Sequence, residues 1–300
     1  MDPARTDVRV APDAGRMVQR AGAPPRVGRD GLLHLRFVER DACTRLVSRR
    51  CRAPLQVLEP LYLASDGSAF AVLLNPGGGI LGGDHLHTEI DAGPGAHVGI
   101  ATPSATKVYR CLGAPAVQHT SIQVGEAAVV EYVPHHLIPH AGAALEQALH
   151  VNLQPRSRLI LYDGIALGRL ARGESWAFRS LASEIRVTDE GGPLYWDRLR
   201  LTPEHAPRLG ALGGSEGYGY LGTMAFCEPA RPDWGEMLEA TRELLAGLPD
   251  LRGGASLLAR GGVVVKVLAA SAHALTAFAG QAWALGRRHL LRRPPLDLRL

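Results

Sequence analysis

The sequence predicts a mainly β fold of the α+β class, with about two helices near the C-terminus. From about residue 32 to 201, apolar and polar residues alternate with a period of two, and turn-forming clusters interrupt them about every ten residues. Glycine (35) and proline (21) make up nearly a fifth of the 300 residues, which favours frequent turns over long helices. Helical periodicity appears only after about residue 230, so a sheet precedes the helices.

Alternating apolar and polar residues, bounded by turn residues, predict the individual strands. In the segment 85–90, alternation places Leu86, Thr88 and Ile90 on one face, and the turn Gly93-Pro94-Gly95 leads into a strand at 97–100. Further strands are expected at 117–124, 128–133, 148–153, 159–162, 183–188 and 193–201, with turns at 125–126 and 154–157 and a hairpin at Asp189–Gly192.

The C-terminal third adds two helices and a pair of strands. Asp233 and Glu236 form a capping-box pattern that predicts a helix over 234–247. Two strands are expected at 257–260 and 263–268, separated by two glycines. A last helix is expected over 272–291. One stripe along it consists of Leu275, Phe278, Ala282, Leu285 and His289. Arg287 and Arg288 favour its negative C-terminal end.

Composition and charge narrow the classes of protein. The 33 basic residues only slightly exceed the 29 acidic ones and are spread along the chain, so nucleic-acid binding is not expected. The four cysteines are far apart, which indicates reduced thiols in the cytoplasm. The segment 267–286 is too weakly hydropathic for a membrane span. We expect a disordered tail over 1–28 and one domain over 29–300, with a β-rich part at 32–201 and a helix-containing part at 230–293.

Two short motifs suggest enzymatic chemistry but lack its context. Gly77, Gly79 and Gly82 satisfy the dinucleotide fingerprint, yet a strand rather than a helix follows them, which favours a tight turn or β-bulge. Ser104 and Lys107 match the S-x-x-K motif of penicillin-recognising enzymes, but no K-T-G or S-D-N accompanies them. A polar strand end is the simpler interpretation.

The twelve histidines raise the question of metal binding. His85 and His87 share a strand face with Glu89, a geometry able to hold a borderline divalent ion, although a solvated outer face explains the same pattern. His135, His136 and His140 cluster around two prolines without a helical metal motif. Any metal is therefore expected to be transient or exposed.

Several segments in register resemble the UreD (UreH) family of urease accessory proteins. The resemblance covers roughly 44–293 and includes the segments 53–60, 74–84, 93–96, 101–110, 131–134, 163–169, 172–174 and 193–198. The matching positions we single out are Pro76, Gly78, Gly82, Gly83, Asp84, Thr102, Pro103, Thr106, Lys107, Tyr109 and Arg169.

The resemblance implies a scaffold that is not an enzyme. It implies an elongated, multi-stranded β protein, with sheets in a helical stack or sandwich, that binds UreF, which recruits the GTPase UreG, and that docks on apo-urease. Two copies of each accessory protein are expected in the complex. Nickel would be cargo passing through the protein, with no tightly bound cofactor and with GTP used by UreG alone. Asp84, His85, His87 and His136 are the candidate transient nickel ligands.

Three positions depart from the family pattern. Pro76 is followed by three glycines where the family has a second proline, His136 replaces a usual carboxylate, and the segment 294–300 lacks an aromatic finish. Two other classes stay open as alternatives: a histidine-rich metal storage or sensing protein, and a hydrolase built on Ser104 and Lys107.

Overall fold

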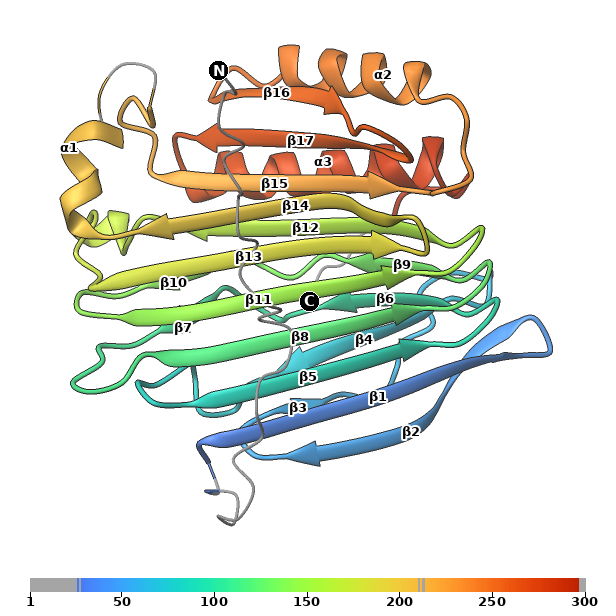
Figure 1. The fold of residues 1–300 in the computed structure, drawn as a ribbon, viewed down its shortest axis with the longest axis horizontal. Helices are drawn as coiled ribbons and strands as arrows, with labels where there is room; N and C mark the ends of the chain where they lie inside the picture. Colours follow the sequence, from blue (N-terminus) through green and yellow to red (C-terminus); the bar gives the residue numbers. More distant parts are fainter. Residues whose placement is uncertain (1–25, 27, 210, 212–213, 297–300) are drawn as a thin grey trace, which may run out of the picture.

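Two large sheets stacked face to face form the protein (Figure 1). The computed structural model describes residues 26, 28–209, 211 and 214–296, so nearly all of the tail expected at 1–28 and the end of the chain at 297–300 lie outside the described residues. The first sheet has the order β14-β13-β11-β8-β5-β1-β2. Its strands are β1 (Asp30–Arg40), β2 (Cys43–Arg52), β5 (His85–Ala92), β8 (Ala116–Val124), β11 (Ala144–Leu153), β13 (Ser180–Asp189) and β14 (Gly192–Leu201).

The second sheet has the order β16-β17-β15-β12-β9-β6-β4-β3, and two short strands, β7 and β10, pair at its side. Its strands are β3 (Gln56–Val57), β4 (Ala69–Leu74), β6 (His97–Ala101), β7 (Thr106–Val108), β9 (Val129–Tyr132), β10 (Leu137–Pro139), β12 (Arg158–Ala166), β15 (Tyr220–Cys227), β16 (Leu251–Leu257) and β17 (Gly262–Ala269). The helices are α1 (Ala206–Leu209), α2 (Gly235–Ala246) and α3 (Ala272–His289), with 3-10 turns at Leu170–Arg172 and Pro203–His205.

The middle of the chain coils from one sheet to the other. The turns predicted at 93–95, 125–126 and 154–157 each carry the chain from the first sheet to the second, so β5, β8 and β11 pair in parallel, as do β6, β9 and β12. The hairpin predicted at Asp189–Gly192 joins β13 to β14 as expected. The predicted mainly β fold with stacked sheets is therefore confirmed.

The two sheets differ in burial because their outer faces differ. Strand β5 alternates between exposed and buried residues, and Leu86, Thr88 and Ile90 point inward as predicted. Every residue of β6 is buried. The outer face of the second sheet packs against α2 and α3 through an apolar cluster that includes Phe226, Phe278 and Met237. A strand covered on both faces reads as a continuous apolar run.

Three details of the C-terminal third correct the sequence predictions. The strand expected at 257–260 is wrong, because the strand is β16, Leu251–Leu257, and a turn follows it. Gly253 and Gly254 resemble a turn signal in the sequence, but they lie inside this edge strand. Helix α2 begins after Trp234, and Asp233 accepts from the Gly235 N–H at 2.8 Å rather than forming the predicted capping box. Helix α3 ends at His289 rather than at residue 291, and Arg287 lies in its last turn as predicted, with its side chain buried.

Candidate functional site

A band of polar side chains crosses the interior between the two sheets. On one side of it lies an apolar cluster with Leu86, Leu145 and Leu181, and on the other side lies a cluster with Ile90 and Ile185. The residues between these clusters form what we call the polar band: Thr88, Gln118, Thr120, Gln147, Ser183 and Tyr195 from the first sheet, and Tyr132 and Asp163 from the second.

The band places a carboxylate among neutral polar groups. Gln147 Nε2 donates to Ser183 Oγ at 2.9 Å and lies 3.5 Å from Asp163 Oδ1, which joins the two sheets. Asp163 stays partly accessible although it lies between the sheets. Gln118 Oε1 is buried without a hydrogen-bond partner in the described structure. Unpartnered buried polar atoms mark room for water or an ion.

Burial controls the charge of this site. It raises the pKa of Asp163 to about 6, helped by the charge of Asp197 and opposed by the Gln147 hydrogen bond and by Lys266. Burial also raises the pKa of Tyr132, so its phenol stays neutral. Asp163 is therefore a carboxyl group that exchanges its proton near neutral pH.

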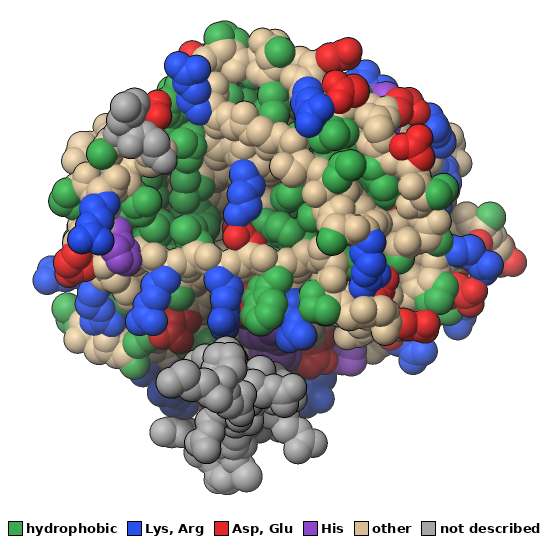
Figure 2. Space-filling view, turned by 45° about the horizontal axis from the view of Figure 1, so that its top comes forward, with side chains coloured by type: hydrophobic (Ala, Val, Ile, Leu, Met, Phe, Trp, Pro, Cys, Tyr) green, Lys and Arg blue, Asp and Glu red, His purple; other side chains and the backbone are tan. Residues whose placement is uncertain are grey.

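The band reaches the surface beyond the edge strand β14. Asp163 on β12 pairs with Thr223 on β15, which pairs with Lys266 on β17. Lys266 Nζ contacts Asp197 Oδ1 at 2.7 Å, and the lysine side chain is 54% exposed. In Figure 2, with the α2 end of the molecule turned forward, this face is hollowed, and hydrophobic side chains line the hollow around a basic and an acidic side chain.

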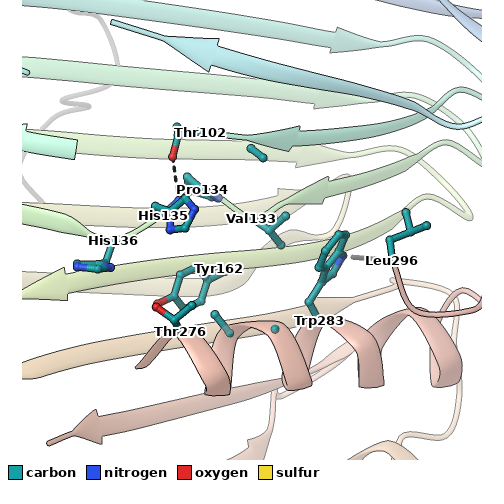
Figure 3. Close-up of a pocket in the computed structure, with 12 residues that line it drawn as sticks. Thr102, Val133, Pro134, His135, His136, Tyr162, Thr276, Trp283 and Leu296 are labelled. Atoms are coloured by element: carbon teal, nitrogen blue, oxygen red, sulfur yellow. Dashed lines mark hydrogen bonds between the residues drawn. The ribbon is translucent and has the colours of Figure 1, made fainter. Parts of the chain in front are cut away.

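A separate pocket of about 260 Å³ lies between the second sheet and α3. Thr276 and Trp283 reach it from the helix, and His135 and His136 reach it from the segment before β10 (Figure 3). Thr102 Oγ1 accepts from the His135 N–H at 2.9 Å, the contact dashed in Figure 3. This bond holds the two histidines at the pocket wall.

A fully buried ion pair anchors α3 beside this pocket. The Glu131 carboxylate accepts from His97 Nε2 at 2.6 Å, from Trp283 Nε1 at 2.5 Å and from the guanidinium of Arg287. Both Glu131 and Arg287 are 0% exposed. Burial raises the pKa of Glu131, but the bond from His97 and the charge of Arg287 outweigh burial and leave it below its usual value. Arg287 lies in the last turn of α3, as the sequence predicts, and its side chain turns inward to this carboxylate.

The four candidate nickel ligands do not form one site. The described residues contain no group of three or more His, Cys, Asp and Glu side chains suited to hold a metal ion. Asp84 is buried and accepts from the Leu81 N–H at 2.8 Å, and burial raises its pKa. His85 is exposed and lies 3.3 Å from Arg26, while His87 bonds Glu89 at 2.7 Å on the outer face of the first sheet.

His136 lies elsewhere, at the pocket beside α3. It is 8% exposed, and its ring packs edge-on against Tyr220, with ring centroids 5.9 Å apart. Burial and the adjacent His135 lower its pKa. A role for His136 in metal handling remains a prediction.

Most of the family-motif residues gather in one structural corner. Tyr109 Oη donates to the carbonyl of Gly78 at 3.1 Å, and a Cβ on Gly79 would lie 2.6 Å from the carbonyl of Lys107. Gly78 and Gly83 have positive φ, and Cys111 lies so close to Gly82 that no side chain fits at position 82. The loop around Pro76 and the segment Thr102–Tyr109 are thus packed together for steric reasons.

The remaining motif residues make further local contacts. Thr106 donates its N–H to the carbonyl of His136 at 3.0 Å, and Arg169 Nε donates to Glu174 at 2.7 Å. The glycine fingerprint forms a tight turn, as predicted. Ser104 and Lys107 are both exposed, and no hydrogen bond joins their side chains in the described structure. The contacts of these motif residues therefore stabilise the local structure.

The sequence pattern alone did not reveal the polar band. Its signal was present, because Asp163 interrupts the apolar strand 159–166 and Gln147 sits at an inward position of β11. A single charge in a buried strand says little until the facing strand is known. Only the stacking of two sheets shows that these polar positions coincide.

Comparison with known proteins identifies the family of this chain. The family profile described as "UreD urease accessory protein" matches residues 29–300. Urease accessory protein UreD of Cupriavidus metallidurans is 34% identical over 275 residues, covering 89% of this chain and 92% of that protein. UreD of Cupriavidus necator is 36% identical, covering 77% and 78%. Urease accessory protein UreD 2 of Streptomyces griseus is 32% identical, covering 93% and 95%.

The family match spans the glycine turn, the polar band and α3 alike, so it covers every feature described above. No described helix is long and apolar enough to cross a membrane. The chain belongs to the UreD family of urease accessory proteins.

Proposed function

We propose that this protein assists nickel insertion into apo-urease as a scaffold without enzymatic activity of its own. The observation that carries the proposal is the polar band, in which one carboxyl group with a pKa of about 6 lies among neutral amide and hydroxyl groups between two apolar clusters. Oxygen ligands of this kind bind a divalent ion weakly. A passage has to release its ion as readily as it accepts it.

The proposed partners follow from the family. UreF binds the scaffold, UreG supplies GTP hydrolysis, and apo-urease receives the nickel, with two copies of each accessory protein in the complex and the cytoplasm as the compartment. The rim at Lys266 and Asp197 is one mouth of the proposed passage. Nickel is cargo here, and no resident cofactor is required.

The test is urease activation in a system reconstituted from this protein, UreF, UreG, GTP, nickel and apo-urease. Asp163→Asn keeps the size of the side chain but removes its charge, so we expect activation to fall, most strongly above pH 6, where the wild-type carboxylate is ionised. Glu126→Gln is the matched control, because Glu126 lies in an exposed ion pair with Arg156.

Both variants must bind UreF equally in a pull-down, because a loss of activation could otherwise reflect a failure to assemble the complex. Activation by Asp163→Asn equal to that of Glu126→Gln at every pH would refute the band as the nickel route. Stoichiometric, tight nickel binding by the chain alone would instead favour the storage or sensing alternative.

A further inference from the structure

A row of histidines crosses the outer face of the first sheet, on the opposite side from the polar band. His87 on β5, His119 on β8 and His150 on β11 all occupy outward positions of neighbouring parallel strands. His87 and His119 are directly paired in register, and their rings stack with centroids 5.2 Å apart and planes 8° apart. The sheet therefore fixes three imidazoles side by side.

His119 and His150 present ring nitrogens to each other. His119 pairs with Ala148, two residues before His150, so the two histidines are diagonal neighbours on one face. His119 Nε2 lies 3.4 Å from His150 Nδ1. This separation is long for a hydrogen bond. It is the spacing of two nitrogens that each lie about 2.1 Å from one tetrahedral ion, about 3.4 Å.

The surroundings orient His150 for this role. Its other nitrogen, Nε2, lies 3.0 Å from Glu184 Oε1, and Arg198 Nε donates to Glu184 Oε2 at 2.6 Å. A carboxylate on the far ring nitrogen selects the tautomer with a free lone pair on the near one, the arrangement typical of metal-bound histidines. His150 Nδ1, which lies nearest to His119 Nε2, therefore keeps a free lone pair.

The state of His119 suits a ligand as well. Burial and its neighbours His87 and His150 lower the pKa of His119, which keeps the imidazole neutral. A metal binds only the unprotonated ring. Glu89, which bonds His87 at 2.7 Å, adds negative charge at the other end of the row.

We propose that His119 and His150 form a surface binding site for a borderline divalent ion such as Ni²⁺ or Zn²⁺. Two protein ligands are fewer than a closed site uses, so water completes the coordination and the ion exchanges readily. The inference is independent of the proposed function, since binding here requires neither urease nor the polar band.

The test is calorimetric titration of the full chain with Ni²⁺ and, separately, with Zn²⁺. We expect saturable binding that is lost in His119→Ala and in His150→Ala and kept in His273→Ala, which removes an exposed histidine from α3. Glu184→Gln, which leaves both ligands in place, should weaken binding about ten- to a hundredfold. Circular dichroism checks that each variant is folded.

The outcomes separate this site from the polar band. Binding by His119→Ala and His150→Ala equal to that of the wild type, or no saturable binding by the wild type, overturns the proposal. Asp163→Asn should bind as the wild type does; loss of binding in that variant alone would place the ion in the interior and also refute the surface site.

Discussion

The buried pair of Glu131 and Arg287 makes a strong prediction about stability. Glu131→Gln keeps the shape of the side chain but leaves the guanidinium of Arg287, which is 0% exposed, without its close charged partner. Removing one partner of a buried ion pair typically costs about 3–5 kcal/mol. Asp66 does not compensate, because its carboxylate lies 3.7 Å from Arg287 and also serves Arg293 at 3.1 Å.

The assay is thermal unfolding of the wild type and the variant at pH 7. At about 2 °C per kcal/mol for a domain of this size, Tm should fall by about 6–10 °C. Glu126→Gln is again the control, because an exposed ion pair contributes at most about 1 kcal/mol. The double variant Glu131→Gln/Arg287→Met should lose less than the sum of the single variants, because it leaves no unpaired charge.

The pH dependence follows from the sign of the shift. The pKa of Glu131 is lower in the folded protein than its ordinary value of 4.5, so its contribution is fully present above pH 4.5 and is lost as the pH falls through the folded pKa. The wild type and Glu131→Gln should therefore converge in stability below that window. Equal Tm values for Glu131→Gln and Glu126→Gln at pH 7 would refute the reasoning.

Four further variants test other parts of the molecule. Asp163→Asn should raise the free energy of unfolding by up to about 3 kcal/mol above pH 6 and leave it unchanged below pH 3.8, because a carboxyl group with a raised pKa costs stability only when it is ionised. Denaturant titration measures this change, and destabilisation by the variant at pH 7 would contradict the expectation. His136→Glu should destabilise by about 1–3 kcal/mol, because the new carboxylate beside Tyr220 is buried, and unchanged Tm would show the position to be freely hydrated. Gly79→Ala should lower the free energy of unfolding by about 1–3 kcal/mol, since the φ of 159° and the close approach of Gly79 to a carbonyl exclude a Cβ. Ser104→Ala, at an exposed position, should change neither Tm nor urease activation.

The sequence by itself determined the local structure and the family. Alternation and turn residues located about half of the strands, and helical periodicity located the two long helices, because these signals act over a few neighbouring residues. The spaced motifs around Gly82 and Tyr109 identified the family, and the structure explains them by close packing between two segments that lie apart in the sequence. The strand misplaced at 257–260 shows the limit, because paired glycines favour a turn unless an edge strand accepts them.

Only the tertiary structure decided which polar residues act together. Asp163 and Gln147 are 16 residues apart and lie on different sheets, while His119 and His150 are 31 residues apart on neighbouring strands. Their meeting depends on turns that carry the chain across the stack instead of reversing it, and alternation predicts a turn without its direction. Strand direction and register are set by the burial of both sheets against each other, a property of the whole fold, so the polar band and the histidine row become visible only when the sheets are stacked.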